Sequence, residues 1–169
     1  MFALQSAPAG TKSQRYSELL EQARALLAGE RDRTANAANL ASLIFHSLPE
    51  LNWAGFYFMK AGELVLGPFQ GKPACVRIAV GRGVCGTAAR DRKTIVVPDV
   101  HAFPGHIACD SASNSEVVVP ILDSRLRGND SLLGVLDLDS PVLRRFDAED
   151  ARGLEALAAL FIESTDLGG

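Results

Sequence analysis

The sequence lacks the features that mark nucleic-acid-binding and membrane proteins. Its 169 residues contain 17 Lys and Arg against 20 Asp and Glu, so the formal net charge is −3. Nucleic-acid binding depends on a basic surface, and we therefore expect no nucleic-acid partner. The chain also has no run of about eighteen apolar residues, the length that a membrane-spanning helix needs. These absences favour an ordinary globular protein without a membrane segment.

The sequence also lacks an export signal and an even number of cysteines. No basic segment precedes the short apolar patch at the N-terminus, so the sequence predicts no secretory signal. The three cysteines are an odd number, which is typical of a reducing compartment where disulfides are transient and catalytic. We predict a cytoplasmic protein. Its length suits one domain, and it contains no internal repeat or low-complexity segment.

Helical patterns occur near both ends of the chain. Residues 1–10 carry no pattern, and we expect a flexible N-terminus there. A capping-box sequence begins at Thr11, and apolar residues at helical spacing follow it. A second amphipathic segment begins at Asp32 or Thr34, and a third follows the helix-capping residue Asp147. Two N-terminal helices and one C-terminal helix are therefore predicted.

The middle of the chain is rich in strand patterns. From Trp53 the period changes to two, which places Trp53, Gly55 and Tyr57 on one face of a strand that is apolar on both faces and therefore central. Further strands are expected at 64–66, 75–80, 94–97, 116–122 and 132–138, with a short helix at 84–92. About six strands, mostly joined as hairpins, predict an α+β fold with one antiparallel sheet, within a single domain at 11–166.

A glycine motif between Gly81 and Gly86 matches the dinucleotide-binding pattern G-x-G-x-x-G, after a strand and at the start of a helix. The helical segment before Thr94 is only about two turns long, whereas a crossover to a parallel neighbour needs a dozen or more residues. We therefore reject the nucleotide interpretation. The motif is better explained as a glycine-rich turn that brings backbone close to a small ligand.

Two of the three cysteines occur beside polar, flexible sequence. Cys75 follows a Gly-Lys-Pro segment, and Cys109 lies in a long stretch with little periodicity. Such places suit a nucleophilic thiol and a mobile resolving thiol. Cys85 begins the short helix, where the helix dipole can favour its thiolate. Cysteines are also common as inert buried residues, and that alternative stays open for each one.

Metal binding is the competing use of these cysteines. His101, His106 and Cys109, together with Cys75 or Cys85, offer four possible ligands. Their spacing matches no common zinc pattern, and the chain has no Cys-x-x-Cys. We therefore predict no bound metal.

Three acids occur near the ends of two neighbouring strands. Alternation places Leu133, Val135, Asp137 and Asp139 on one face of the last strand, and Glu116 starts the strand before it. Each acid alone is best explained as a solvated strand end, but together they suggest a pocket. This group can bind a substrate ammonium, or mutual repulsion can keep one carboxyl protonated as a general acid. The aromatic residues of the central strand form either a wall of this pocket or part of the core.

Seven longer motifs resemble those of a known family. They are WAGFY (53–57), GPFQGKPAC (67–75), GVCG (83–86), DV (99–100), FPGHIACD (103–110), SEVVVP (115–120) and GVLDLD (134–139). Together they resemble the free methionine-(R)-sulfoxide reductases, which are small GAF-domain enzymes. The resemblance runs from about Tyr16 to Leu157, and its cysteine-bearing motifs distinguish it from GAF domains in general. It implies a GAF domain at 11–166.

The resemblance also implies a reaction. Free methionine-R-sulfoxide would be reduced to methionine, without a bound cofactor and with electrons from thioredoxin, supplied by NADPH through thioredoxin reductase. Cys109 would attack the sulfoxide sulfur and become a sulfenic acid. Cys75 would then form an intramolecular disulfide with it, which thioredoxin would reduce. Cys85 would serve as an alternative resolving thiol or stabilise the site.

The same resemblance assigns roles to the pocket residues. Glu116, Asp137 and Asp139 would bind substrate and supply the acid, with Glu116 and Asp139 as the catalytic carboxyls. Trp53 and Tyr57 would hold the methyl group and side chain of the sulfoxide. An acidic pocket attracts an α-ammonium, which free methionine has and a residue within a protein lacks. The acids therefore explain a preference for the free amino acid.

Two other functions remain open at this stage. GAF domains commonly bind small ligands without turnover, and the same cysteines can act as a thiol redox sensor. The segment 123–130 departs from the family pattern by its length and basic residues, which suggests a surface insertion. Because homo-oligomers mostly close as two-fold dimers, a homodimer is the expected form of any self-association.

Overall fold

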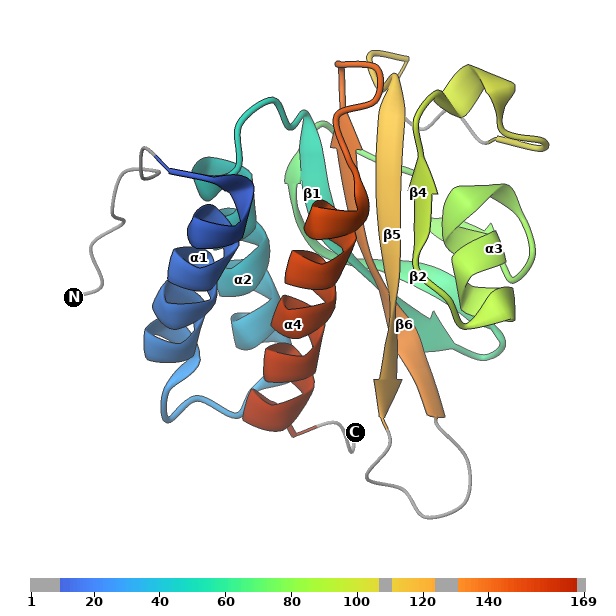
Figure 1. Ribbon diagram of the computed structural model, residues 1–169. Helices are drawn as coiled ribbons and strands as arrows, with labels where there is room; N and C mark the ends of the chain where they lie inside the picture. Colours follow the sequence, from blue (N-terminus) through green and yellow to red (C-terminus); the bar gives the residue numbers. More distant parts are fainter. Residues whose placement is uncertain (1–9, 107–110, 124–130, 167–169) are drawn as a thin grey trace.

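The computed structural model describes residues 10–106, 111–123 and 131–166, and within them it has an α+β architecture (Figure 1). The surface insertion predicted at 123–130 lies outside the described residues except for Asp123. The helices are α1 (Lys12–Leu27), α2 (Arg33–Ser47), α3 (Gly83–Asp91), the 3₁₀ turn η1 (Val100–Ala102) and α4 (Ala148–Ser164). The strands are β1 (Trp53–Lys60), β2 (Glu63–Gly71), β3 (Arg77–Ala79), β4 (Ile95–Val97), β5 (Ser115–Asp123) and β6 (Ser131–Ser140).

Three of the α-helices begin at the side-chain caps that the sequence predicted. Thr11 forms a capping box with Gln14 at the start of α1, and Asp147 forms one with Asp150 at the start of α4. Asp32, rather than Thr34, caps α2 by accepting a hydrogen bond from the Ala35 amide. In the described part of the chain, none of the helices combines the length and apolar character that a membrane crossing requires.

The sheet is antiparallel throughout, in the order β3-β2-β1-β6-β5-β4, and β1 is central as predicted. Helices α1, α2 and α4 cover one face, while α3 lies on the other (Figure 1). Side chains of β1 alternate between these faces: Phe56 packs in the core under the three long helices, whereas Trp53 and Tyr57 face α3. The sheet thus separates a large structural core from a smaller cluster that carries the site.

The glycine motif forms a tight turn and no dinucleotide fold. Strands β3 and β4, before and after α3, lie at opposite edges of the sheet and so are not parallel neighbours. The Gly81 amide donates to the Gly86 carbonyl over 2.7 Å. A Cβ on Gly86 would lie 2.4 Å from the Ala79 carbonyl oxygen, so glycine is required for this close approach.

Two predictions about strands were wrong. Leu133 packs on the helix-covered face instead of sharing a face with Asp137, because a bulge pairs Ile121 with Gly134 but Leu122 with Leu132. The extra residue in β6 reverses the alternation at that point. Cys75 precedes β3, which begins at Arg77, so it lies outside the strand ladder in the segment that enters β3.

Candidate functional site

A cavity of about 40 Å³ lies between the sheet and α3. It is lined by Trp53, Tyr57, Pro73, Ala74, Ile78, Arg82, Gly83, Val84, Cys85, His106, Ser113, Glu116, Asp137 and Asp139. One water molecule needs about 10–15 Å³ by this kind of measure, so the cavity holds only a few waters in this state. Its lining combines an aromatic wall, a thiol and three carboxyl groups, which is the composition of a small-molecule site.

Strand register brings the three acids together. Asp139 in β6 pairs with Glu116 in β5 on one side and with Trp53 in β1 on the other. Asp137, two residues earlier in β6, points to the same face and pairs with Gly55. A Cβ at Gly55 would lie 2.4 Å from Phe69 Cβ and 2.6 Å from Trp53 Cη2, so glycine allows the Trp53 ring to lie over this position. The sequence prediction of a shared acidic pocket is therefore confirmed.

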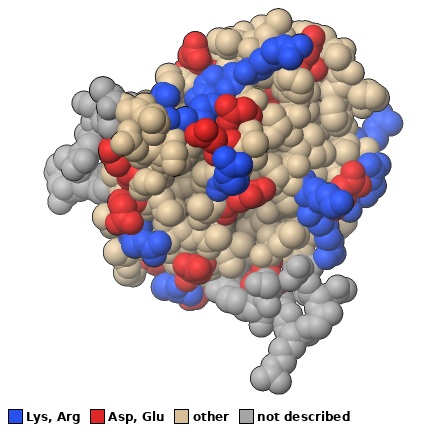
Figure 2. Space-filling model, in the orientation of Figure 1, with Lys and Arg blue, Asp and Glu red and all other residues tan. Residues whose placement is uncertain are grey.

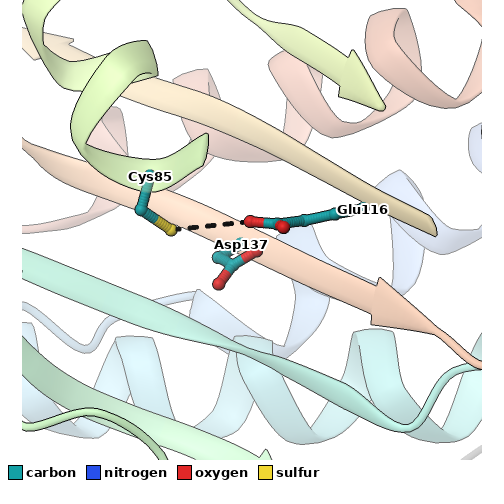
Figure 3. Close-up of side chains that lie close together, drawn as sticks. All are labelled: Cys85, Glu116 and Asp137. Carbon is teal, nitrogen blue, oxygen red and sulfur yellow. Dashed lines mark hydrogen bonds between the residues drawn. The ribbon is translucent and has the colours of Figure 1, made fainter. Parts of the chain in front are cut away.

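Cys85, Glu116 and Asp137 form the buried centre of the site (Figure 3). Their ligand atoms all lie within 4.8 Å of one another, and the three residues are 4%, 6% and 6% exposed. The Cys85 thiol donates a hydrogen bond to Glu116 Oε1 over 3.9 Å. Asp137 Oδ1 is buried and has no hydrogen-bond partner. A buried carboxylate in this position is costly unless it is protonated or bound by a cation.

Burial favours the protonated forms of all three groups. It raises the pKa of Asp137 to about 7, although hydrogen bonds with Cys85 and Glu116 act in the opposite direction. The pKa of Glu116 is raised well above its usual range by burial first, and then by the charges of Asp137 and Asp139. We expected mutual repulsion to keep a carboxyl protonated, and the structure shows that burial is the larger cause.

The expectation of a helix-activated Cys85 thiolate was wrong. Burial raises the pKa of Cys85 well above its usual range, and the charges of Asp137 and Glu116 raise it further. These acids come from β5 and β6, so their effect on α3 could not be read from the local sequence. Cys85 is a free, buried thiol and, in this environment, a protonated one.

The aromatic wall is held rigidly at both ends. The Trp53 indole donates to the Lys72 carbonyl over 3.2 Å, and the Tyr57 hydroxyl donates to the Cys75 carbonyl over 3.0 Å. The two rings stack with centroids 5.9 Å apart, and Phe69 also stacks on Trp53, at 5.3 Å. Burial, followed by the charge of Asp137, raises the pKa of Tyr57, so its hydroxyl stays protonated as a donor.

Comparison with known proteins identifies the family. The GAF domain model matches residues 13–162. The free methionine-R-sulfoxide reductase of Escherichia coli is 50% identical over 148 residues, covering 88% of this chain and 87% of that protein. The enzyme of the same name from Saccharomyces cerevisiae is 44% identical over 160 residues, covering 90% and 87%. The chain belongs to the free methionine-R-sulfoxide reductase family of GAF domains.

A solved structure supports the same assignment. The free methionine-R-sulfoxide reductase of Neisseria meningitidis, in complex with its substrate, matches with a TM-score of 0.89 at 44% identity. The match covers 97% of this chain and 95% of that one. The resemblance inferred from the motifs is therefore confirmed at the level of family and fold.

In this reductase-family domain, most of the predicted site residues surround one cavity. They are Trp53, Tyr57, Cys85, Glu116, Asp137 and Asp139. Cys75 lies beside the cavity, where its carbonyl accepts the hydrogen bond from the Tyr57 hydroxyl, and its sulfur is disulfide-bonded. Cys109 lies outside the described residues. The structure thus assembles the predicted acids and aromatics around a free thiol, while the chemical roles assigned to them remain predictions.

Three polar residues of the lining, Arg82, His106 and Ser113, were not among the predicted site residues. Arg82 precedes α3 and is exposed at the cavity. Ser113 accepts a hydrogen bond from the Asn52 side chain over 3.0 Å. His106 also lines the cavity, and burial, followed by the charge of His101, lowers its pKa. The sequence did contain a signal for Arg82: it is a cationic residue within the glycine motif 81–86, which was expected to lie close to a small ligand.

Proposed function

We propose that this protein reduces free methionine-R-sulfoxide to methionine. The observation that carries the proposal is the buried cluster of Cys85, Glu116 and Asp137 next to an aromatic wall, in a domain of this family. Breaking the S–O bond requires a proton on the departing oxygen. Carboxyl groups with raised pKa values remain protonated near neutral pH and can donate that proton.

The chemical step uses Cys109 as the nucleophile. Its thiolate attacks the sulfoxide sulfur while the protonated carboxyl of Glu116 donates to the sulfoxide oxygen. The oxygen is transferred to the cysteine, so methionine leaves and Cys109 becomes a sulfenic acid. Sulfur in the substrate gains two electrons and sulfur in Cys109 loses two. The proton that Cys109 loses when its thiol ionises balances the one that Glu116 donates, so Glu116 can be protonated again.

A second cysteine completes the cycle. Cys75 attacks the sulfenic acid, water leaves, and a disulfide forms. The disulfide-bonded state of Cys75 supports this assignment. Thioredoxin then reduces the disulfide by thiol exchange in the cytoplasm, drawing on NADPH through its reductase. Cys85 is too well buried to be the first choice as resolving thiol, and we assign it to the acidic cluster.

Substrate selection follows from the charges around the cavity. Asp139 is less buried than Glu116 and Asp137 and is placed to accept the α-ammonium of a free amino acid. Arg82 supplies a cation for the α-carboxylate, and Trp53 offers an apolar face to the methyl group. A methionine sulfoxide inside a peptide lacks both of the charged groups. The arrangement therefore favours the free amino acid.

Substrate entry requires the site to open. The cavity of about 40 Å³ has room for only a few water molecules, fewer than methionine sulfoxide would replace. Pro73 and Ala74 line this cavity and directly precede the disulfide-bonded Cys75. We infer that the structure describes the oxidised state, in which this rim is closed over the site. Reduction of the disulfide releases the segment that carries Pro73 and Ala74 and allows the substrate to bind.

Methionine release tests the proposal. The wild-type protein, with thioredoxin, thioredoxin reductase and NADPH, is given free R-sulfoxide, free S-sulfoxide or a peptide-bound sulfoxide. Release from the free R form alone, abolished by Cys109→Ser, is the expected result. Cys75→Ser should release at most one methionine per protein and then stop under thioredoxin. Absence of release from every substrate would overturn the reductase and favour ligand binding or redox sensing.

A further inference from the structure

The centre of the site has the donor set of a zinc ligand cluster. Cys85 on α3, Glu116 on β5 and Asp137 on β6 present one sulfur and two carboxyl groups to a common point (Figure 3). Cys85 Sγ lies 3.9 Å from Glu116 Oε1. A tetrahedral zinc ion, with bonds of about 2.3 Å to sulfur and about 2.0–2.2 Å to oxygen, separates such ligands by roughly 3.5 Å. The Cys85–Glu116 separation is close to this value, and all three ligand atoms lie within 4.8 Å of one another.

A second observation points to a cation. Asp137 is 6% exposed, and its Oδ1 is buried without a hydrogen-bond partner. Its carboxyl group lies beside the hydrogen bond between Cys85 and Glu116 (Figure 3). The adjoining cavity of about 40 Å³ is large enough for an ion and a water molecule. The site therefore has a buried carboxyl oxygen without a hydrogen-bond partner, and the adjoining cavity has room for an ion and a water molecule.

We propose that Cys85, Glu116 and Asp137 bind a zinc-class divalent cation, which excludes the small-molecule substrate from the site. The thiol selects zinc-class ions over Mg²⁺ and Ca²⁺, which require oxygen ligands. Binding ionises the thiol and the carboxyl groups, and their protons are released to solvent. This donor set differs from the one considered from sequence, which depended on the two histidines and Cys109.

Exclusion follows from the position of the three ligands. Glu116 cannot donate a proton while it is ionised and bound to a cation, and the ion occupies the side of the cavity next to the proton donors. Loss of reductase activity in the presence of zinc is the functional consequence. This part rests on the proposed function, whereas the cation site itself does not.

The binding experiment uses the double variant Cys75→Ser/Cys109→Ser, in which Cys85 is the remaining cysteine of the three. Cadmium is the probe, because its bond to a thiolate gives an ultraviolet charge-transfer band, and Zn²⁺ is added as a competitor. We expect one equivalent of Cd²⁺ to produce the band, Zn²⁺ to abolish it and Mg²⁺ to leave it unchanged. A protein that gives no band with Cd²⁺ and no heat with Zn²⁺ overturns the site.

Two further variants in this background identify the ligands. Asp137→Asn keeps the size of the side chain, and Glu18→Gln alters an exposed acid on α1 as a matched control. Losing an outer-shell partner of a metal costs roughly 10–100-fold in affinity, so loss of the Asp137 ligand should weaken Zn²⁺ binding by at least that much. Glu18→Gln should bind Zn²⁺ as the parent does. Equal affinities in the Asp137→Asn and Glu18→Gln proteins, both shown to be folded by circular dichroism, would reject the assignment.

Competition with the substrate tests exclusion separately. Free methionine-R-sulfoxide should weaken Zn²⁺ binding by the double variant, in which no cysteine of the redox pair is left to react. If Zn²⁺ binds with an affinity that the sulfoxide does not change, the exclusion is refuted while the cation site stands. Methionine release by the wild-type protein, measured without added metal, decides the proposed function independently. Failure of one proposal is therefore distinguishable from failure of the other.

Discussion

The substitution Asp137→Asn tests whether burial keeps the acidic cluster protonated. Asp137 has its pKa raised from 3.8 to about 7 in the folded protein. A shift of about 3 units corresponds to about 4 kcal/mol, at about 1.36 kcal/mol per unit. The folded state binds more protons than the unfolded state between about pH 4 and 7, so this contribution to stability is present below pH 4 and lost as pH rises through 7.

The expected result is a pH-dependent difference between variant and wild type. Asn stays neutral, so Asp137→Asn should gain stability relative to wild type by about 4 kcal/mol between about pH 4 and pH 8. Glu116 remains in both proteins and adds a slope of the same sign. Asp147, whose pKa is lowered to about 2 mainly by its hydrogen bond with Lys12, acts in the opposite direction at low pH, but it is common to both proteins.

Urea unfolding at several pH values between these limits measures the difference, with Glu18→Gln as the control for a lost exposed acid. The control should follow the wild-type curve. If the free energies of unfolding of wild type and Asp137→Asn change in parallel with pH, Asp137 is ionised in the folded protein at pH 7. The argument that this cluster stores a proton for the sulfoxide oxygen would then fail.

Three further predictions concern the site and its support. Glu116→Gln should lower kcat by about 10²–10⁴-fold with a smaller change in KM, because it removes the proposed proton donor, and steady-state methionine release measures it. Fluorescence of Trp53, the single tryptophan, should respond to free methionine only after the Cys75 disulfide is reduced, and an equal response in the oxidised protein would contradict the closed rim. Asp150→Asn should destabilise the fold by about 3–5 kcal/mol at neutral pH, as shown by urea unfolding, because it removes the buried negative charge that pairs with Arg145 and Lys12.

Local sequence signals predicted the elements well, whereas pairing and burial decided the details of the site. The capping boxes at Thr11 and Asp147 are formed by residues within one turn, so they are visible in the sequence. Alternation correctly placed Trp53 with Tyr57 on one face of β1 and Asp137 with Asp139 on one face of β6, because strand geometry fixes that period. Leu133 was misplaced because the bulge depends on how β5 pairs with β6.

The environment of Cys85 was the most serious error, and its cause is nonlocal. A cysteine in the first turn of a helix suggests a stabilised thiolate when only α3 is considered. In the fold, α3 packs against β5 and β6, which bring Glu116 and Asp137 to the thiol and remove it from water. The pKa of a buried side chain depends on the groups that the rest of the fold brings next to it, and residue spacing in the sequence does not predict those groups.

Two buried acids on opposite faces of the sheet show how partners separate a structural carboxylate from a reactive one. Asp150, at 0% exposure, is bound by Lys12 at 2.6 Å, by Tyr16 at 2.9 Å and by Arg145 at 3.2 Å. Asp137 is nearly as buried but faces a thiol and another acid. Neutralising Asp150 removes a charge that its partners need, whereas neutralising Asp137 removes a charge that the fold disfavours. The same Asp→Asn change should therefore have opposite effects on stability at neutral pH, and the destabilised carboxylate is the one adjoining the cavity, where a proton donor or a cation is required.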